Sequence, residues 1–69
     1  MSTIKVVEII GTSKKDWENA AKNAVSEAGE TIDGITGIEV VGQTAKVEKN
    51  KISEFRTTIK VAFKVKSKR

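Results

Sequence analysis

The sequence of 69 residues contains no cysteine, no histidine, no proline and no tyrosine. Without cysteine and histidine, the chain cannot form a disulfide or the zinc sites that these residues build. The general acids and bases that remain are carboxylates and lysines, and none of them stands in a recognisable catalytic motif. We therefore predict that the protein is not an enzyme, and we assign no catalytic residue and no metal ligand.

The sequence also lacks a long apolar segment. No apolar run approaches the roughly 18 residues needed to cross a bilayer. The first five residues lack the basic and apolar regions of a signal peptide. We expect a cytoplasmic protein with no membrane partner.

Acidic residues are outnumbered by basic ones, with 9 Asp and Glu against 13 Lys and Arg and a net charge of +4. Much of the excess lies near the C-terminal end, at Lys60, Lys64, Lys66, Lys68 and Arg69. The simplest interpretation is a solubilising terminus. The alternative is a patch that binds anions or nucleic acid.

The length predicts one domain, residues 1–69. A chain of this size buries only roughly 60% of the surface that its unfolded form exposes. Small domains gain further stability from disulfides, a structural metal or oligomerisation. Since cysteine and histidine are absent, we expect the protein to associate with copies of itself.

The first half of the chain predicts a strand followed by a helix. Residues 4–10 are rich in Val and Ile and indicate a strand that ends at 11–13. Ser13 and Asp16 have the spacing of a capping box. Apolar residues then recur with helical spacing for about five turns, at Trp17, Ala20, Ala21, Ala24, Val25, Ala28, Ile32 and Ile35. Gly34 or Gly37 is the expected end of this helix. Because the stripe is mostly alanine, we expect a sheet that curves closely around the helix.

The second half predicts a β-hairpin. Apolar and polar residues alternate over 55–65, and a second strand runs over about 38–47. Its apolar phase changes around Gly42, which indicates a β-bulge. Residues 48–51 form the turn. The expected fold is α+β, a single β-α-β-β domain with one helix packed on a three-stranded antiparallel sheet of order 1-3-2.

The helix covers one face of this sheet, and the other face is mixed in character. It carries Glu8, Glu39, Arg56, Thr58 and Lys60 together with Val6, Ile10 and Val41. A mixed face suits a polar interface between subunits, in which the two glutamates pair with the two cations across chains. Phe55 and Phe63 fall on the helix side, which leaves no aromatic to stack on a base and makes nucleic-acid binding the weaker alternative.

Five segments, taken in order, resemble the dodecins over nearly the whole chain. They are KVVEII at 5–10, GTS at 11–13 opening an alanine-rich helix, TID at 31–33, IEV at 38–40 and IKVAF at 59–63. The resemblance implies the β-α-β-β fold and a hollow homododecamer of cubic symmetry. It also implies a store or buffer of flavin, such as FMN or riboflavin, in place of an enzyme.

The resemblance directs attention to three candidate cofactor-binding residues: Lys5, Gly37 and Arg56. In flavin-binding members a Trp at the position of Gly37 stacks on the flavin, and a Gln at the position of Arg56 hydrogen-bonds its edge. Losing the aromatic removes a contact of ~1–3 kcal/mol per ring. Replacing Gln with Arg removes an acceptor and adds a permanent charge. The sequence therefore predicts weakened flavin binding.

Trp17 and the pair Phe55-Arg56 resemble a subset of dodecins associated with calcium. Trp17 is expected to pack against the sheet edge or a neighbouring subunit. Lys64 and Lys66 are an alternative phosphate grip for coenzyme A, which some dodecins bind. A small ligand or ion held in a cage is thus the favoured function, against a purely structural oligomer or a basic nucleic-acid-binding module.

Overall fold

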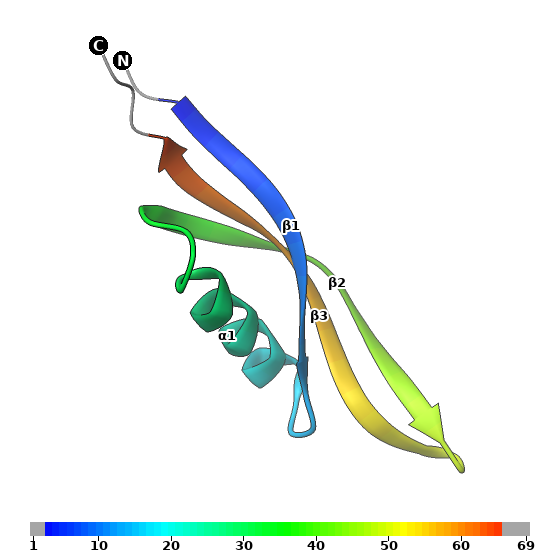
Figure 1. Cartoon of the computed structure of the whole chain (residues 1–69). Helices are drawn as coiled ribbons and strands as arrows, with labels where there is room; N and C mark the ends of the chain where they lie inside the picture. The colour runs from blue at the N-terminus through cyan, green and yellow to red at the C-terminus, as the bar shows by residue number, and fades with distance from the viewer. Residues whose placement is uncertain (1–2, 66–69) are drawn as a thin grey trace.

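The computed structural model describes residues 3–65 and consists of one helix and three strands. The elements are β1 (Thr3–Ser13), α1 (Trp17–Ala28), β2 (Ile35–Glu48) and β3 (Lys51–Val65). The strands form one antiparallel sheet in the order β1-β3-β2, with α1 on one face (Figure 1). The predicted fold and strand order are confirmed.

The first strand is longer than predicted, because residues 11–13 continue it. Gly11, Thr12 and Ser13 pair with Thr57, Arg56 and Phe55 of β3. Gly11 is a point of close approach, since a Cβ there would clash with the backbone oxygen of Ala20 and lie 2.7 Å from the Ala24 Cβ. The glycine therefore lets α1 lie directly on β1. Its role is this close approach, and β1 continues through it to Ser13.

The helix begins with a different cap from the one predicted. Asp16 is the N-cap, and its carboxylate accepts a hydrogen bond from the Asn19 backbone N–H at 2.6 Å. Ser13, still in β1, accepts from the Lys15 N–H at 2.9 Å and donates to Asn19 Oδ1 at 2.8 Å. The predicted capping box is thus wrong, because Ser13 lies outside the helix start.

The helix is also shorter than the five turns predicted, since it ends at Ala28 with Gly29 as C-cap. Gly34, with φ of 80°, lies in the loop before β2, and its carbonyl accepts from the Lys64 N–H at 3.1 Å. Ile35 already pairs with β3, and Gly37 lies inside β2. The helical spacing continues past the helix because Ile35, now in β2, packs against the same core, while Ile32 is half-buried in the loop.

The hairpin has the predicted bulge and turn. The register shifts between Val40 and Gly42, as predicted. Two further shifts, between Ile35 and Gly37 and between Lys46 and Val47, were not predicted. In the turn, Lys49 and Asn50 have φ of 53° and 65°, as in the two-residue turns whose twist matches that of the strands.

The core of the chain is small. The buried apolar residues are Ala20, Ala24, Ala28, Ile59 and Val61. Large apolar side chains exposed to solvent are more numerous: Ile4, Val6, Ile10, Ile38, Val40, Val41, Val47, Ile52 and Val65. One chain therefore leaves more of its large apolar side chains in water than it buries, which is typical of surfaces that associate.

We predict that Gly11→Ala destabilises the protein. The added methyl group meets helix backbone, which cannot rotate away, so the free energy of unfolding should fall by about 1–3 kcal/mol. Urea denaturation followed by circular dichroism, at fixed chain concentration, measures this change. Gly42→Ala is the matched control, because its Cβ would meet nothing within 4 Å. Equal midpoints for the two variants would contradict the prediction.

Candidate functional site

The sheet face that α1 does not cover carries most of the candidate residues. We call it the open face. The strand register arranges it in four rows across β1, β3 and β2: Val6-Ala62-Gly37, Glu8-Lys60-Glu39, Ile10-Thr58-Gly42 and Thr12-Arg56-Thr44. Apart from Val41, which lies at the bulge between Val40 and Gly42, the residues predicted to share this face stand in these rows.

The first row forms a hollow at Gly37. A cavity of about 240 Å³ is lined by Val6, Gly37, Ile38, Glu39, Lys60 and Ala62. A Cβ placed on Gly37 would meet nothing within 4 Å, and the φ of this glycine is not positive. The position therefore has room for a side chain and a backbone that accepts one.

The second row places charges of opposite sign side by side. Lys60 on the central strand is the register partner of both Glu8 and Glu39. The ion pairs among the described residues are Lys22–Glu18, Lys46–Glu48 and Arg56–Glu54, at 3.4, 3.5 and 3.5 Å, so neither row glutamate is paired with Lys60. In residues 3–65 no three acidic groups cluster as a metal site.

The other two candidate residues lie apart from Gly37. Arg56 is on the open face, but six residues before Ala62 on β3, which corresponds to ~20 Å of strand. Lys5 pairs with Phe63 on the helix side and lines a cavity of about 510 Å³ with Thr31, Ile32, Asp33, Gly34, Phe63, Lys64 and Val65. Within one chain the three predicted cofactor-binding residues do not meet. Lys66, proposed with Lys64 as a phosphate grip, lies outside the described residues.

Trp17 ties the helix to the hairpin, which refines the prediction that it packs on the sheet edge. Its ring lies edge-on to Phe55 with centroids 4.9 Å apart, and its Nε1–H donates to the Thr44 carbonyl at 2.8 Å. The Thr57 hydroxyl donates to the Trp17 carbonyl at 2.8 Å. Trp17 is therefore a structural residue that orients the hairpin where it leaves the helix.

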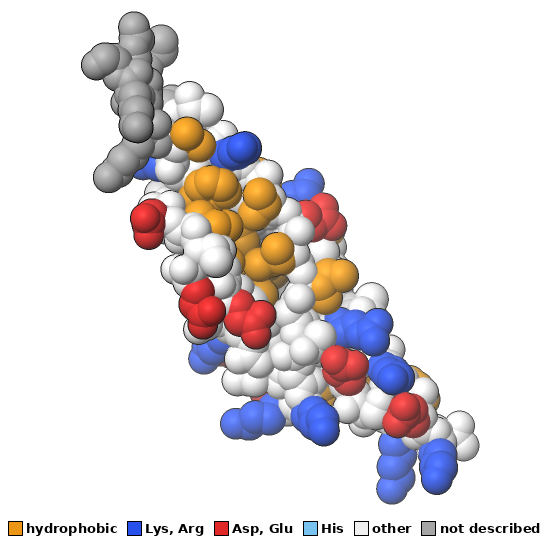
Figure 2. Space-filling view, viewed as in Figure 1, with side chains coloured by type: hydrophobic (Ala, Val, Ile, Leu, Met, Phe, Trp, Pro, Cys, Tyr) orange, Lys and Arg blue, Asp and Glu red, His pale blue; other side chains and the backbone are white. Residues whose placement is uncertain are grey.

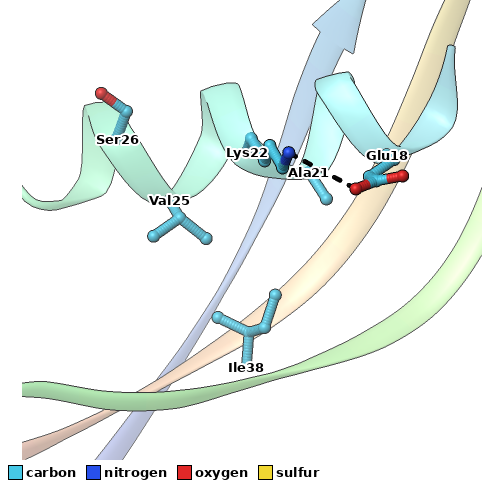
Figure 3. A pocket seen from close by; sticks show the side chains of 6 residues that line it. All are labelled: Glu18, Ala21, Lys22, Val25, Ser26 and Ile38. Atoms are coloured by element: carbon cyan, nitrogen blue, oxygen red, sulfur yellow. Dashed lines mark ion pairs between the residues drawn. The ribbon is translucent and has the colours of Figure 1, made fainter.

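A groove between α1 and β2 was not predicted. Because α1 packs on β1 and β3, the helix side of β2 stays open. The resulting groove has a volume of about 430 Å³ and is lined by Glu18, Ala21, Lys22, Val25, Ser26 and Ile38 (Figure 3). Val25 and Ile38 point toward each other across it. In the sequence, the apolar Ile38 and Val40 indicate this groove only to a reader who already knows where the helix lies.

The fold defines a small α+β domain whose sheet has one face covered by a helix and one face free. No helix among residues 3–65 is long and apolar enough to cross a membrane. The Dodecin family model matches residues 3–66. The chain therefore belongs to the dodecin family.

Known proteins of this family match along almost their whole length. Calcium dodecin of Mycobacterium tuberculosis is 38% identical over 66 residues, which cover 96% of this chain and 93% of the relative. A solved structure of that calcium-chelating antigen, described as having a novel calcium-binding site, has a TM-score of 0.82 at 37% identity and covers 97% of this chain and 96% of its own.

A dodecin from Streptomyces coelicolor is less similar in sequence and more similar in shape. Its structure has a TM-score of 0.94 at 25% identity, covering 97% of this chain and 96% of that one. The relatives therefore rank differently by TM-score than by sequence identity. The choice of ligand has to be argued from individual residues.

Proposed function

We propose that this chain assembles into a hollow homododecamer that sequesters a small ligand or ion, with calcium favoured over flavin, and that it catalyses no reaction. The observation that carries the choice of ligand is the chemistry of the open face. This face has carboxylates in its second row and no aromatic side chain in any row.

Self-assembly is supported by the distribution of apolar surface. Exposed Val and Ile side chains lie on the open face, along β2 and at the hairpin turn. The buried core is three alanines, one isoleucine and one valine. Since a single copy leaves this surface in water, contact with further copies is the arrangement that covers it, as in an oligomer whose folding and association are coupled.

Flavin is disfavoured because the open face offers nothing flat to stack on. The chain has three aromatic residues in all. Trp17 and Phe55 pack on each other, and Phe63 is the register partner of Lys5 on the helix side. At Gly37, where the family resemblance implies a stacking Trp in flavin binders, the chain has the hollow instead.

Calcium is favoured because Glu8 and Glu39 bring oxygen ligands to one row of the open face. Calcium takes six to eight oxygens, more than two carboxylates supply, and Lys60 stands between them. A calcium site on this face therefore needs carboxylates from more than one copy. The similar protein named calcium dodecin adds independent support.

We predict an assembled mass of twelve chains. Size-exclusion chromatography with light scattering measures the mass at micromolar chain concentration, and mass photometry repeats it after dilution. The species should be single and should persist in moderate salt, because apolar contacts supply most of its stability. A monomer at all concentrations would overturn the assembly proposal.

We predict that calcium binding depends on Glu8 and Glu39. In titration calorimetry of the assembled protein, Glu8→Gln or Glu39→Gln should weaken calcium binding by about tenfold or more, because each removes a negative ligand. Glu27→Gln on the helix, away from the open face, is the control and should bind as the parent does. No calcium heat with the parent, or equal affinity in all three variants, would exclude this site.

We predict that the double substitution Gly37→Trp with Arg56→Gln creates flavin binding. A Cβ on Gly37 would meet nothing within 4 Å, and the two changes restore the stacking and hydrogen-bonding groups that the family resemblance implies. Quenching of FMN fluorescence should appear in the double variant and be weak in the parent. Gly37→Leu with Arg56→Gln controls for bulk alone. Strong quenching by the parent would contradict the prediction that this chain binds flavin weakly.

A further inference from the structure

The end of the β2–β3 hairpin extends beyond the rest of the fold. β1 ends at Ser13, opposite Phe55, so residues 46–54 form a two-stranded ribbon with no third strand beside it (Figure 1). We call this ribbon the hairpin tip. Its Val47 and Ile52, register partners, are 60% and 49% exposed. A two-stranded ribbon alone is marginally stable in water. We therefore expect another surface to cover the apolar pair at its end.

The groove between α1 and β2 is an apolar surface without a partner. Its floor is formed by Ala21, Val25 and Ile38, and Ile38 is 42% exposed. Val40, next along the same side of β2, is 51% exposed. Hydrophobic side chains gather beside the helix in the space-filling view (Figure 2).

The hairpin tip cannot fill the groove of its own chain. Ile38 and Val47 lie on the same strand, nine residues apart, which corresponds to ~30 Å of extended backbone. The strand between them is held to β3 by a continuous ladder with one-residue shifts. Any contact between hairpin tip and groove must therefore join two copies.

The charges around the two surfaces are complementary. Residues 16–33, which include α1, hold five carboxylates and a single lysine. At the hairpin tip, Glu48 is paired with Lys46 and Glu54 with Arg56. Lys49 and Lys51 at the turn have no carboxylate partner among the described residues. Basic side chains crowd this end of the hairpin, and acidic ones lie over the helix (Figure 2).

We propose that the hairpin tip of one copy docks into the α1–β2 groove of a second copy. Val47 and Ile52 cover the apolar floor, while Lys49 and Lys51 face Glu18, the carboxylate that lines the groove. The contact joins unlike surfaces, so it closes either reciprocally in a pair or head-to-tail in a ring. This inference rests on the proposed self-assembly and specifies which surfaces produce it.

Cross-linking tests the contact cleanly, because the chain has no cysteine of its own. Chains carrying Ile38→Cys are refolded together with mass-tagged chains carrying Ile52→Cys, and the mixture is oxidised or treated with a short bismaleimide. We expect covalent dimers that contain one chain of each kind. The matched control replaces Ile38→Cys with Ile10→Cys, a more exposed site on the open face, and should give several-fold less mixed dimer.

The outcomes separate this contact from the assembly itself. If the parent forms a dodecamer but Ile38→Cys and Ile52→Cys cross-link no faster than the control, the docking contact is wrong and the cage stands. If the parent is a monomer, both proposals fall.

A second variant tests the same contact without cross-linking. Ile52→Asp places a charge on the apolar side chain that fills the groove, so the assembled mass should fall by at least half. The circular dichroism spectrum should keep its β and α bands, since Ile52 is half exposed and lies outside the core. A dodecamer of unchanged mass and stability would overturn the contact.

Discussion

The close approach of α1 to β1 at Gly11 is the constraint on which the rest of the structure depends. The strand has no side chain there, and the helix presents Ala20 and Ala24 to the same spot, so the backbones lie almost in contact. This packing is tight, but it buries little apolar area, since alanine contributes few carbons. Hydrophobic stabilisation scales with that area, at roughly 25 cal/mol per Å². A helix held in this way therefore stabilises a single copy only modestly.

The same approach decides which surfaces stay uncovered. With α1 anchored on β1 and packed against β3, the helix leaves Ile38 and Val40 on β2 uncovered. The groove and the exposed Ile38 and Val40 follow from that placement, whereas the hairpin tip is free because β1 ends at Ser13. The exposure of the groove is thus a consequence of the closest contact in the fold. In the proposed assembly, the groove and the hairpin tip are the surfaces that other copies cover.

The strand in which apolar and polar residues alternate strictly was predicted well. The helix, whose end had to be located, was not. Period-two alternation over 55–65 has one interpretation, so β3, its faces and the strand order followed from the sequence. The helix end did not, because Ile32 and Ile35 keep the helical spacing while belonging to a loop and a strand. The family resemblance grouped Gly37 and Arg56 as cofactor-binding residues, but the strand register puts ~20 Å of β3 between their positions. The groove depends on where the helix lies, which no local pattern records.

The residues of the open face explain why the proposed ligand site has to be shared between copies. Glu8 and Glu39 flank Lys60 in one row. Each copy therefore offers two carboxylates together with a lysine whose positive charge repels a metal cation nearby. A divalent ion is held there only if carboxylates from neighbouring copies outweigh the lysines. The hollow at Gly37 adjoins this row and lies far from Arg56, so a planar ligand that uses both positions also has to bridge two chains. In either case the proposed binding site would exist only in the assembly, so the contacts between copies would control its affinity.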